Sequence, residues 1–184
     1  MNEKSVRMLT VQEVADILHV HPNTVRHWSE QGLLKAYRVG PRGDRRFRVE
    51  DIDNFLNLCR REDGRAVLVV DDDPAILQLL KDAVEGRGYK VTCCETGERA
   101  LEELERQSFA LVFLDLILPG MSGVDVLRAI RDKSQRTVVA VLTGYGDAPV
   151  ALQAMALGPM FFIRKPFGVS DILQVIDTVV GAQR

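Results

Sequence analysis

Apolar runs of four to six residues, separated by stretches with helical periodicity, fill the chain after about residue 65. Such runs are typical of strands that are buried on both faces of a sheet. They occupy residues 66–70, 89–94, 110–114, 137–142 and 160–163. Strands that alternate with helices predict an α/β doubly wound fold, a five-stranded parallel sheet with right-handed crossovers.

The earlier part of the chain has a different pattern, which predicts a helix-turn-helix. Thr10 and Glu13 have the spacing of a capping box, so a first helix is expected to start at Val11. Pro22 suits the first position of a second helix. A third helix over residues 50–58 is predicted to close a small core.

The predicted second helix carries several polar residues. Val25 and Trp28 are three residues apart and are expected to face the first helix. The polar side chains are then expected to point outward: Asn23, Thr24, Arg26 and His27. Asn, Arg and Thr side chains read base edges or hold phosphates when a short helix enters the major groove of DNA. A solvated helix face is the alternative interpretation.

Two short strands are predicted next, over residues 36–39 and 45–49, around a turn at residues 40–44. Alternation along these strands points four side chains inward: Tyr37, Val39, Phe47 and Val49. The arginines are left on the other face or near the tip: Arg38, Arg42, Arg45, Arg46 and Arg48. Because only one aspartate lies among them, residues 36–48 have a net charge of +4. A basic hairpin beside a polar helix is the electrostatic footprint of a DNA-binding wing.

Residues 9–56 resemble the excisionase/MerR family of winged helix-turn-helix domains, through TVRHW, LLKAYRVG and the arginine-rich stretch before VEDIDNFL. The resemblance implies that the second helix lies in the major groove of double-stranded DNA. It also implies that the wing contacts flanking phosphates or the minor groove. Full-length MerR regulators continue into a long dimerising helix, and no such helix follows this domain. Dimerisation is therefore expected to come from another part of the chain.

Three adjacent aspartates follow the first predicted strand of the sheet directly. Asp73 precedes Pro74 and suits the N-cap of a helix, which leaves Asp71 and Asp72 to repel each other unless a cation or hydrogen bonds compensate. Asp115 follows another strand. The carboxyl ends of parallel strands meet at one edge of a doubly wound sheet, where such folds place their sites. Three carboxylates at this edge predict an oxygen-ligand site suited to Mg²⁺.

Thr143 and Lys165 stand at the ends of two further strands. A hydroxyl and an ammonium at the same edge can stabilise the equatorial oxygens of a phosphoryl group in transfer. An aspartate nucleophile with Mg²⁺ gives an acyl phosphate. One such residue at a strand end is unremarkable, whereas five at the ends of three or four strands favour a phosphoryl-transfer site.

The segments VVDDDP, DLILPGMSG, LTGYGD and IRKPF make residues 65–184 resemble the receiver domain of two-component response regulators. The resemblance implies a flavodoxin-like sheet with strand order 2-1-3-4-5. It implies that Asp115 accepts a phosphoryl group from a sensor histidine kinase. Asp72 and the backbone carbonyl of Ile117 would bind Mg²⁺ together with Asp115, and Asp71 would act through water.

The same resemblance implies roles for residues near the sheet edge. Thr143 would be the switch hydroxyl and Lys165 the phosphoryl-binding ammonium, with a cis peptide before Pro166. Phe162 occupies the aromatic switch position, and its other interpretation is a core residue of a strand end.

Ile117 and Tyr145 stand where side chains overhang the phosphoryl group in this family. Neither readily orients an attacking water, so the aspartyl phosphate is expected to last minutes or longer.

The segment at residues 148–157 is apolar nearly all round a predicted helix. Val150 and Ala156 stand where relatives of the receiver family usually carry polar residues. A dimerisation face is one interpretation, and a tolerant surface of small residues is the other.

Composition limits the class of protein. Of 184 residues, 46% are hydrophobic and 27% charged, with a net charge of −2. These values exclude disordered, collagen-like and disulfide-miniprotein classes. The three cysteines have no CxxC spacing, and no apolar run approaches the roughly 20 residues of a membrane span. The expectation is a cytoplasmic protein without a membrane segment.

These patterns predict two domains, a winged helix-turn-helix over residues 1–60 and a receiver over residues 66–184, with a short linker over residues 61–65. The predicted function is a phosphorylation-controlled transcription regulator that forms a homodimer, and not an enzyme beyond its own phosphoryl transfer. Two alternatives remain: a phospho-gated adaptor whose small domain binds protein, and a phosphate sink that drains a kinase.

Overall fold

The computed structural model describes residues 7–18, 20, 22–30, 32–59, 66–133, 137–144, 148–158 and 161–179. It divides into two compact units, Met1–Leu58 and Cys59–Arg184, and each is considered by itself. The predicted linker at residues 61–65 lies outside the described part. None of the helices described is both long and apolar enough to cross a membrane.

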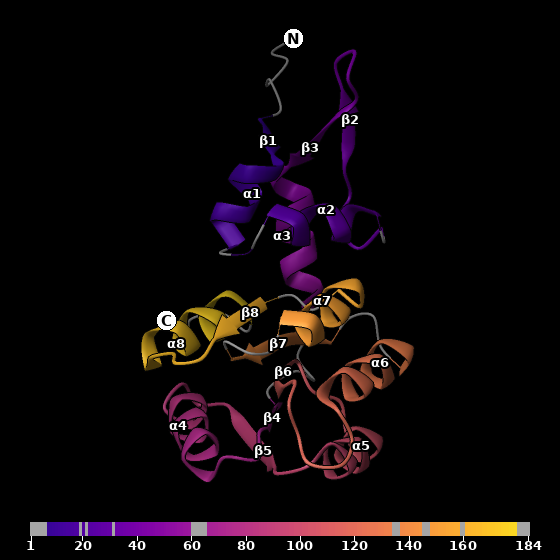
Figure 1. Cartoon of the computed structure of the whole chain (residues 1–184). Helices are drawn as coiled ribbons and strands as arrows, with labels where there is room; N and C mark the ends of the chain where they lie inside the picture. Colours follow the sequence, from indigo (N-terminus) through magenta and orange to yellow (C-terminus); the bar gives the residue numbers. More distant parts are fainter. Residues whose placement is uncertain are drawn as a thin grey trace. The chain divides into compact units, whose positions relative to one another are not determined.

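The N-terminal unit contains three helices and three strands within its described residues (Figure 1). They are β1 (Met8–Thr10), α1 (Val11–Leu18), α2 (Pro22–Glu30), β2 (Tyr37–Val39), β3 (Asp44–Arg48) and α3 (Val49–Cys59). The strands form an antiparallel sheet in the order β1-β3-β2. The hairpin of β2 and β3 is the predicted wing. Strand β1 was not predicted, and it makes β3 the central strand.

The capping box at the start of α1 is confirmed. The backbone N–H of Glu13 donates to Thr10 Oγ1 at 3.1 Å, and the backbone N–H of Thr10 donates to Glu13 Oε2 at 2.8 Å. Helix α1 starts at Val11, as predicted. Behind it, Trp28 packs against Phe55 of α3 with ring centroids 5.1 Å apart. The buried face of α1, with Val14 and Leu18, completes the small core that Trp28 and Phe55 share.

The predicted inward face of the wing is only partly correct. Phe47 is fully buried and Tyr37 is half-buried. Val39 is 47% exposed and Val49 is 41% exposed, so their predicted inward orientation is wrong. Val39 is the last residue of the three-residue strand β2, and Val49 is the first residue of α3 rather than part of a strand. Alternation therefore does not extend to either position.

The C-terminal unit alternates strands and helices. They are β4 (Ala66–Val70), α4 (Pro74–Glu85), β5 (Lys90–Cys94), α5 (Gly97–Arg106), β6 (Leu111–Asp115), α6 (Gly123–Lys133), β7 (Val138–Thr143), α7 (Ala148–Ala156), β8 (Phe161–Arg164) and α8 (Val169–Val179). All strand pairs are parallel, in the order β5-β4-β6-β7-β8. This is the predicted 2-1-3-4-5 order. Helices α4 and α8 cover one face of the sheet, and α5, α6 and α7 cover the other (Figure 1).

Arg131 of α6 ties the end of α7 to the sheet. Its guanidinium donates to the backbone carbonyls of Thr137, Leu157 and Gly158 at 2.7, 3.1 and 3.0 Å. Burial lowers the pKa of Arg131 to about 10, so the group stays charged at neutral pH. A cation at the C-terminal end of a helix is stabilised by the partial negative charge of its last carbonyls. The position of α7 is thus set at its C-terminal end.

Candidate functional site

The sheet register brings the predicted acidic residues to one edge. The residues that precede Asp71 and Asp115 lie opposite each other in the parallel pair of β4 and β6. At the end of the β7–β8 pair, the backbone N–H of Lys165 donates to the carbonyl of Thr143 at 2.7 Å. The carboxyl ends of these strands therefore bring Asp71, Asp115, Thr143 and Lys165 to one edge of the sheet.

Lys165 joins two buried carboxylates. Its Nζ donates to Oδ2 of Asp71 at 2.7 Å and to Oδ2 of Asp115 at 2.5 Å. Asp71 is fully buried and Asp115 is 5% exposed. Carboxylate oxygens of Asp71, Asp115 and the exposed Asp72 all lie within 4.8 Å of one another. The structure thus brings four predicted site residues into one cluster.

Backbone donors orient the two buried carboxylates. The N–H of Asp73 donates to Oδ1 of Asp71, and the N–H of Ile117 donates to Oδ1 of Asp115, both at 3.0 Å. The side chain of Asp73 caps α4 by accepting from the N–H of Ala75 at 2.8 Å, which confirms its predicted N-cap role. Each buried carboxylate therefore keeps its Oδ2 directed at Lys165.

The charges of this cluster do not balance. Burial raises the pKa of Asp71, although the hydrogen bond from Lys165 opposes the change. Burial alone would lower the pKa of Lys165, but the hydrogen bonds to Asp115 and Asp71 outweigh it and raise that pKa. Lys165 is therefore a cation that contacts two carboxyl groups, and the carboxyl group of Asp72 lies within 4.8 Å of those two. An excess of negative charge on hard oxygen ligands is the setting that favours a divalent cation.

The remaining predicted receiver residues lie around the cluster. Thr143 is half-buried, and its Oγ1 donates to the carbonyl of Gly144 at 3.4 Å. Phe162 pairs with Val141 in the sheet and is partly buried against the main core. The peptide before Pro166 is cis, as predicted. Phe162 therefore has the surroundings of a core residue, and its switch role stays a prediction.

Ile117 is 51% exposed although its backbone N–H holds Asp115. An apolar side chain thus stands in solvent two residues after the candidate phosphoacceptor. Tyr145, the other predicted overhanging residue, lies outside the described residues.

Gly123 is a site residue that the sequence analysis missed. It is the first residue of α6, and its N–H donates to the carbonyl of Leu116 at 3.1 Å. A Cβ at this position would clash with the backbone carbonyl oxygen of Asp115 and lie 2.7 Å from Cα of Leu116. Only glycine allows α6 to begin this close to the acidic cluster. The sequence feature that could have indicated this role is the position of Gly123, eight residues after Asp115.

The polar side chains of α2 fall into two groups. Asn23 and Arg26 are exposed, and Arg26 Nη1 donates to Asn23 Oδ1 at 2.6 Å. Thr24 is only 7% exposed, so its predicted outward orientation is wrong. Thr24 is four residues before the buried Trp28, and residues four apart share one face of a helix. The side chain of His27 lies outside the described part.

The arginines of the wing also differ in their surroundings. Arg38 Nη1 donates to the carbonyl of Gly43 at 3.0 Å. Arg48 lies over the ring of Tyr37, with its Cζ 4.5 Å from the centroid. Arg42 is exposed and has no hydrogen bond or ion pair within the described residues. Arg38 and Arg48 therefore brace the hairpin, and Arg42 is the least constrained.

A polar pocket of about 480 Å³ lies between α1, α2 and the wing. It is lined by the start of α1, by Arg26, and by Arg38, Arg42, Arg45 and Arg46 of the wing. Five guanidinium groups around one open concavity favour an anion such as a phosphate. This pocket and the exposed face of α2 form the candidate nucleic-acid interface.

Comparison with known proteins gives two family matches. Residues 67–177 match the response regulator receiver domain, and residues 8–60 match a helix-turn-helix domain. The transcriptional regulatory protein FixJ of Bradyrhizobium diazoefficiens is 30% identical over 114 residues, 62% of this chain and 56% of FixJ. The acid tolerance regulatory protein ActR of Rhizobium meliloti is 36% identical over 112 residues, 61% of this chain and 58% of ActR. The chain therefore spans little more than half the length of these relatives.

Solved structures agree with the family matches. A response regulator receiver domain protein from Clostridium thermocellum is 32% identical, with a TM-score of 0.58, over 62% of this chain and 93% of that one. A CheY-like receiver domain protein from Methanospirillum hungatei is 30% identical, with a TM-score of 0.59, over 62% of this chain and 91% of that one. The chain therefore belongs to the response regulators, with a helix-turn-helix domain at residues 8–60 followed by a receiver domain at residues 67–177.

Proposed function

We propose that this protein is a DNA-binding transcription regulator of a two-component system, controlled by phosphorylation of Asp115. The observation that supports this most directly is the position of Lys165, whose ammonium contacts both Asp71 and Asp115 at the sheet edge. A sensor histidine kinase would donate the phosphoryl group. The relatives FixJ and ActR are named as regulatory proteins, which favours a regulator over a metabolic enzyme.

Each residue of the cluster would have a separate role. The carboxylate of Asp115 would attack the phosphorus atom of the kinase's phosphohistidine; the new O–P bond would form as the P–N bond breaks, so that Asp115 becomes an acyl phosphate and the histidine imidazole leaves. Lys165 would stabilise the negative charge on the transferred phosphoryl oxygens, and the hydroxyl of Thr143 would do the same from the end of β7. Because backbone N–H groups already hold Asp71 and Asp115, little reorganisation is needed when the phosphoryl group arrives.

The donor set of the cluster fits Mg²⁺. Asp71, Asp72 and Asp115 offer carboxylate oxygens within 4.8 Å of one another, and the carbonyl of Ile117 would complete the protein ligands. A bound Mg²⁺ would neutralise charge between the attacking carboxylate and the phosphoryl donor. Removal of the metal with a chelator should therefore stop phosphorylation without unfolding the protein.

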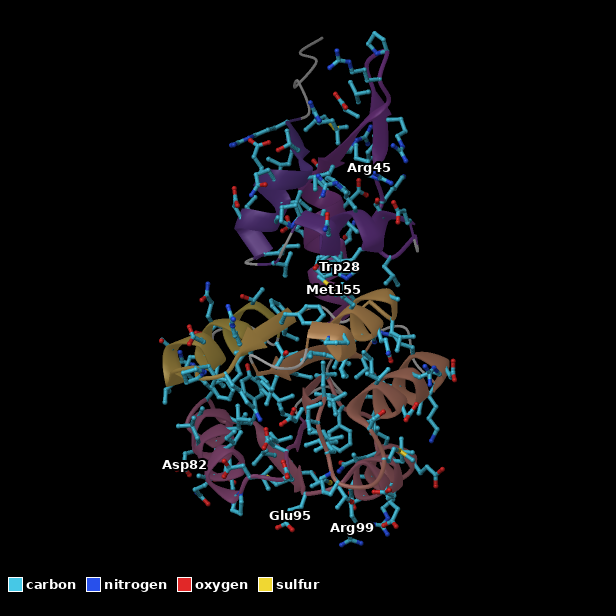
Figure 2. All side chains as sticks on the ribbon, in the orientation of Figure 1. Trp28, Arg45, Asp82, Glu95, Arg99 and Met155 are labelled. Carbon is cyan, nitrogen blue, oxygen red and sulfur yellow. The ribbon has the colours of Figure 1, made fainter. Side chains whose placement is uncertain are left out.

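Thr143 and Phe162 would respond to the phosphoryl group on Asp115. The resulting conformational change would reach the surface of α7. Three exposed side chains lie on one face of α7: Leu152, which is 67% exposed, Met155, which is 37% exposed, and Ala156. Figure 2 labels Met155 among them. Val150, for which the sequence left a dimerisation face and a tolerant surface open, is partly buried against the core. We propose that the exposed face forms a homodimer when Asp115 is phosphorylated, through a shift in a pre-existing equilibrium.

Double-stranded DNA would bind the N-terminal unit. Asn23 and Arg26 would reach base edges or phosphates from α2 in the major groove, and the wing would contact the neighbouring backbone. Two such units in a dimer would bind paired half-sites with higher occupancy than one, because the second contact is made at a high effective concentration.

The proposed phosphorylation is tested by mixing the protein with acetyl phosphate and Mg²⁺ and mapping the modified residue by mass spectrometry after borohydride trapping. The wild type and Asp82→Asn, which changes an exposed aspartate of α4, should each gain one phosphoryl group on Asp115 (Figure 2). Asp115→Asn should gain none. Equal labelling of Asp115→Asn, or no labelling of the wild type, would contradict the proposal.

A further inference from the structure

An ion pair joins the two elements of the candidate nucleic-acid interface. Arg45 of β3 and Glu30 at the C-terminal end of α2 are 15 residues apart in sequence, and Arg45 Nη2 lies 2.6 Å from Glu30 Oε1. The side chain of Arg45 is 19% exposed and that of Glu30 is 58% exposed. Figure 2 shows Arg45 on the wing. This contact connects β3, the central strand of the sheet and one strand of the wing, to the helix that would enter the DNA groove.

Arg45 and Arg42 line the same pocket but differ in their ion pairing and in their exposure to solvent. The charge of Arg45 is matched by Glu30, and most of its side chain is covered. Arg42 is exposed, and no ion pair holds it within the described residues. A guanidinium that is already paired gains less from a phosphate than one that is free, because the existing pair must be loosened first. The two arginines are therefore suited to different tasks.

Simultaneous contact of α2 and the wing with DNA requires a fixed distance between them. The hairpin is joined to β1 through β3, and β2 pairs over only three residues. A short hairpin of this kind has limited rigidity of its own. Holding a binding element in its bound position lowers the entropy that is lost on association.

We propose that Arg45 is a positioning residue that works through Glu30: the Glu30–Arg45 ion pair holds the wing at the distance from α2 that DNA requires, while Arg42 contacts a backbone phosphate. This inference rests on the proposed DNA-binding function. The proposal gives different roles to Arg42 and Arg45, which the sequence analysis treats alike as basic residues of the wing.

The test is an exchange of charges. The full-length protein, with beryllofluoride and Mg²⁺, is titrated against a duplex enriched from a random DNA pool by the wild type. Arg45→Glu should bind weakly because it faces Glu30. The exchange variant Glu30→Arg/Arg45→Glu should bind at least about threefold tighter than Arg45→Glu, the lower end of the coupling expected for contacting residues.

Arg42→Glu is the matched control, since it makes the same charge change in the same pocket. Glu30→Arg should improve the binding of Arg42→Glu less than it improves that of Arg45→Glu. Equal improvement of both, or an exchange variant no tighter than Arg45→Glu, would overturn the proposal, because Arg45 would then act on DNA by its own charge.

A second readout needs no DNA. Backbone amide hydrogen exchange in β2 and β3 of the free protein should be faster in Arg45→Gln and in Glu30→Gln, close to wild type in the exchange variant, and unchanged in Arg42→Gln. If the wild type binds no duplex, the proposed DNA-binding function is wrong. If all these proteins have identical exchange rates, the Glu30–Arg45 ion pair does not stabilise the position of the wing, and the positioning role is wrong.

Discussion

The carboxylates of Asp71 and Asp115 have the same pattern of hydrogen-bond partners. In each, Oδ1 accepts a backbone N–H from the residue two positions further along, and Oδ2 accepts from Lys165. The orientation of both carboxylates is thus fixed by local backbone geometry before any ligand binds. Such preorganisation lowers the cost of stabilising the charge that develops during transfer.

The exposed side chain of Ile117 should control how long the acyl phosphate lasts. Ile117→Asn supplies a polar group that can orient an attacking water, so hydrolysis should be faster by about tenfold, or about 1.4 kcal/mol in activation free energy. The decay of phosphorylated protein, followed by phosphate-affinity electrophoresis, measures this rate. The wild type should decay over minutes or longer, and Val39→Asn should match it. A wild-type half-life of a few seconds would contradict the proposal that Ile117 shields the acyl phosphate from water.

Gly123→Ala should destabilise the receiver unit by about 1–3 kcal/mol, because the added methyl group meets backbone atoms of Asp115 and Leu116 rather than a movable side chain. Urea unfolding of the full chain measures the change. Gly168→Ala is the matched control, since its added Cβ would lie 3.6 Å from the Ser170 hydroxyl. Equal stability of the two variants would show that α6 can shift away from the acidic cluster.

The role of a side chain could be predicted from the sequence wherever it depends on a short local motif or on a strand end. The capping box of α1, the N-cap at Asp73 and the convergence of Asp71 with Asp115 all follow from local spacing or from strand ends. Thr24 was misplaced because its chemical type was weighed above its position four residues before Trp28. The role of Gly123 depends on an interatomic distance that no spacing shows.

At the scale of single elements, α7 exposes two large apolar side chains, Leu152 and Met155, whereas each other helix exposes at most one among the described residues. Leu152→Glu should weaken the phosphorylation-dependent dimer by about tenfold, equivalent to about 1.4 kcal/mol, because a charge would be buried in the apolar contact. Sedimentation velocity with beryllofluoride measures the association. Gln153→Glu adds the same charge on a neighbouring exposed position and should leave the dimer intact. Dimers of equal strength in both variants would place the contact elsewhere.

The elements that escaped prediction are held by distant partners. Strand β1 has three residues and pairs with β3, nearly forty residues later, so its own sequence carries no strand pattern. Val39 and Val49 follow the alternation of a strand, but one ends β2 and the other starts α3. The strands of the receiver sheet were easier to predict, because each is a continuous apolar run buried on both faces.

For the whole molecule, the order of the five parallel strands was predictable through resemblance to the receiver family, and the structure has that order. The sequence also indicated both families, the helix-turn-helix and the receiver domain. The contact of Glu30 with Arg45 was not predictable, since no local pattern records a pairing between side chains 15 residues apart. In the proposed function, coupling between the acidic cluster and the wing runs through dimer formation and is therefore a property of the pair of chains.

The central claim is that phosphorylation of Asp115 controls DNA binding. Selection from a random DNA pool, with Mg²⁺ alone and with beryllofluoride added as a phosphoryl mimic, tests it most directly. We predict that a paired motif is enriched only with the mimic, and that Asp115→Asn enriches none under either condition. Equal enrichment of one motif with and without the mimic, or no enrichment in either, would contradict the claim.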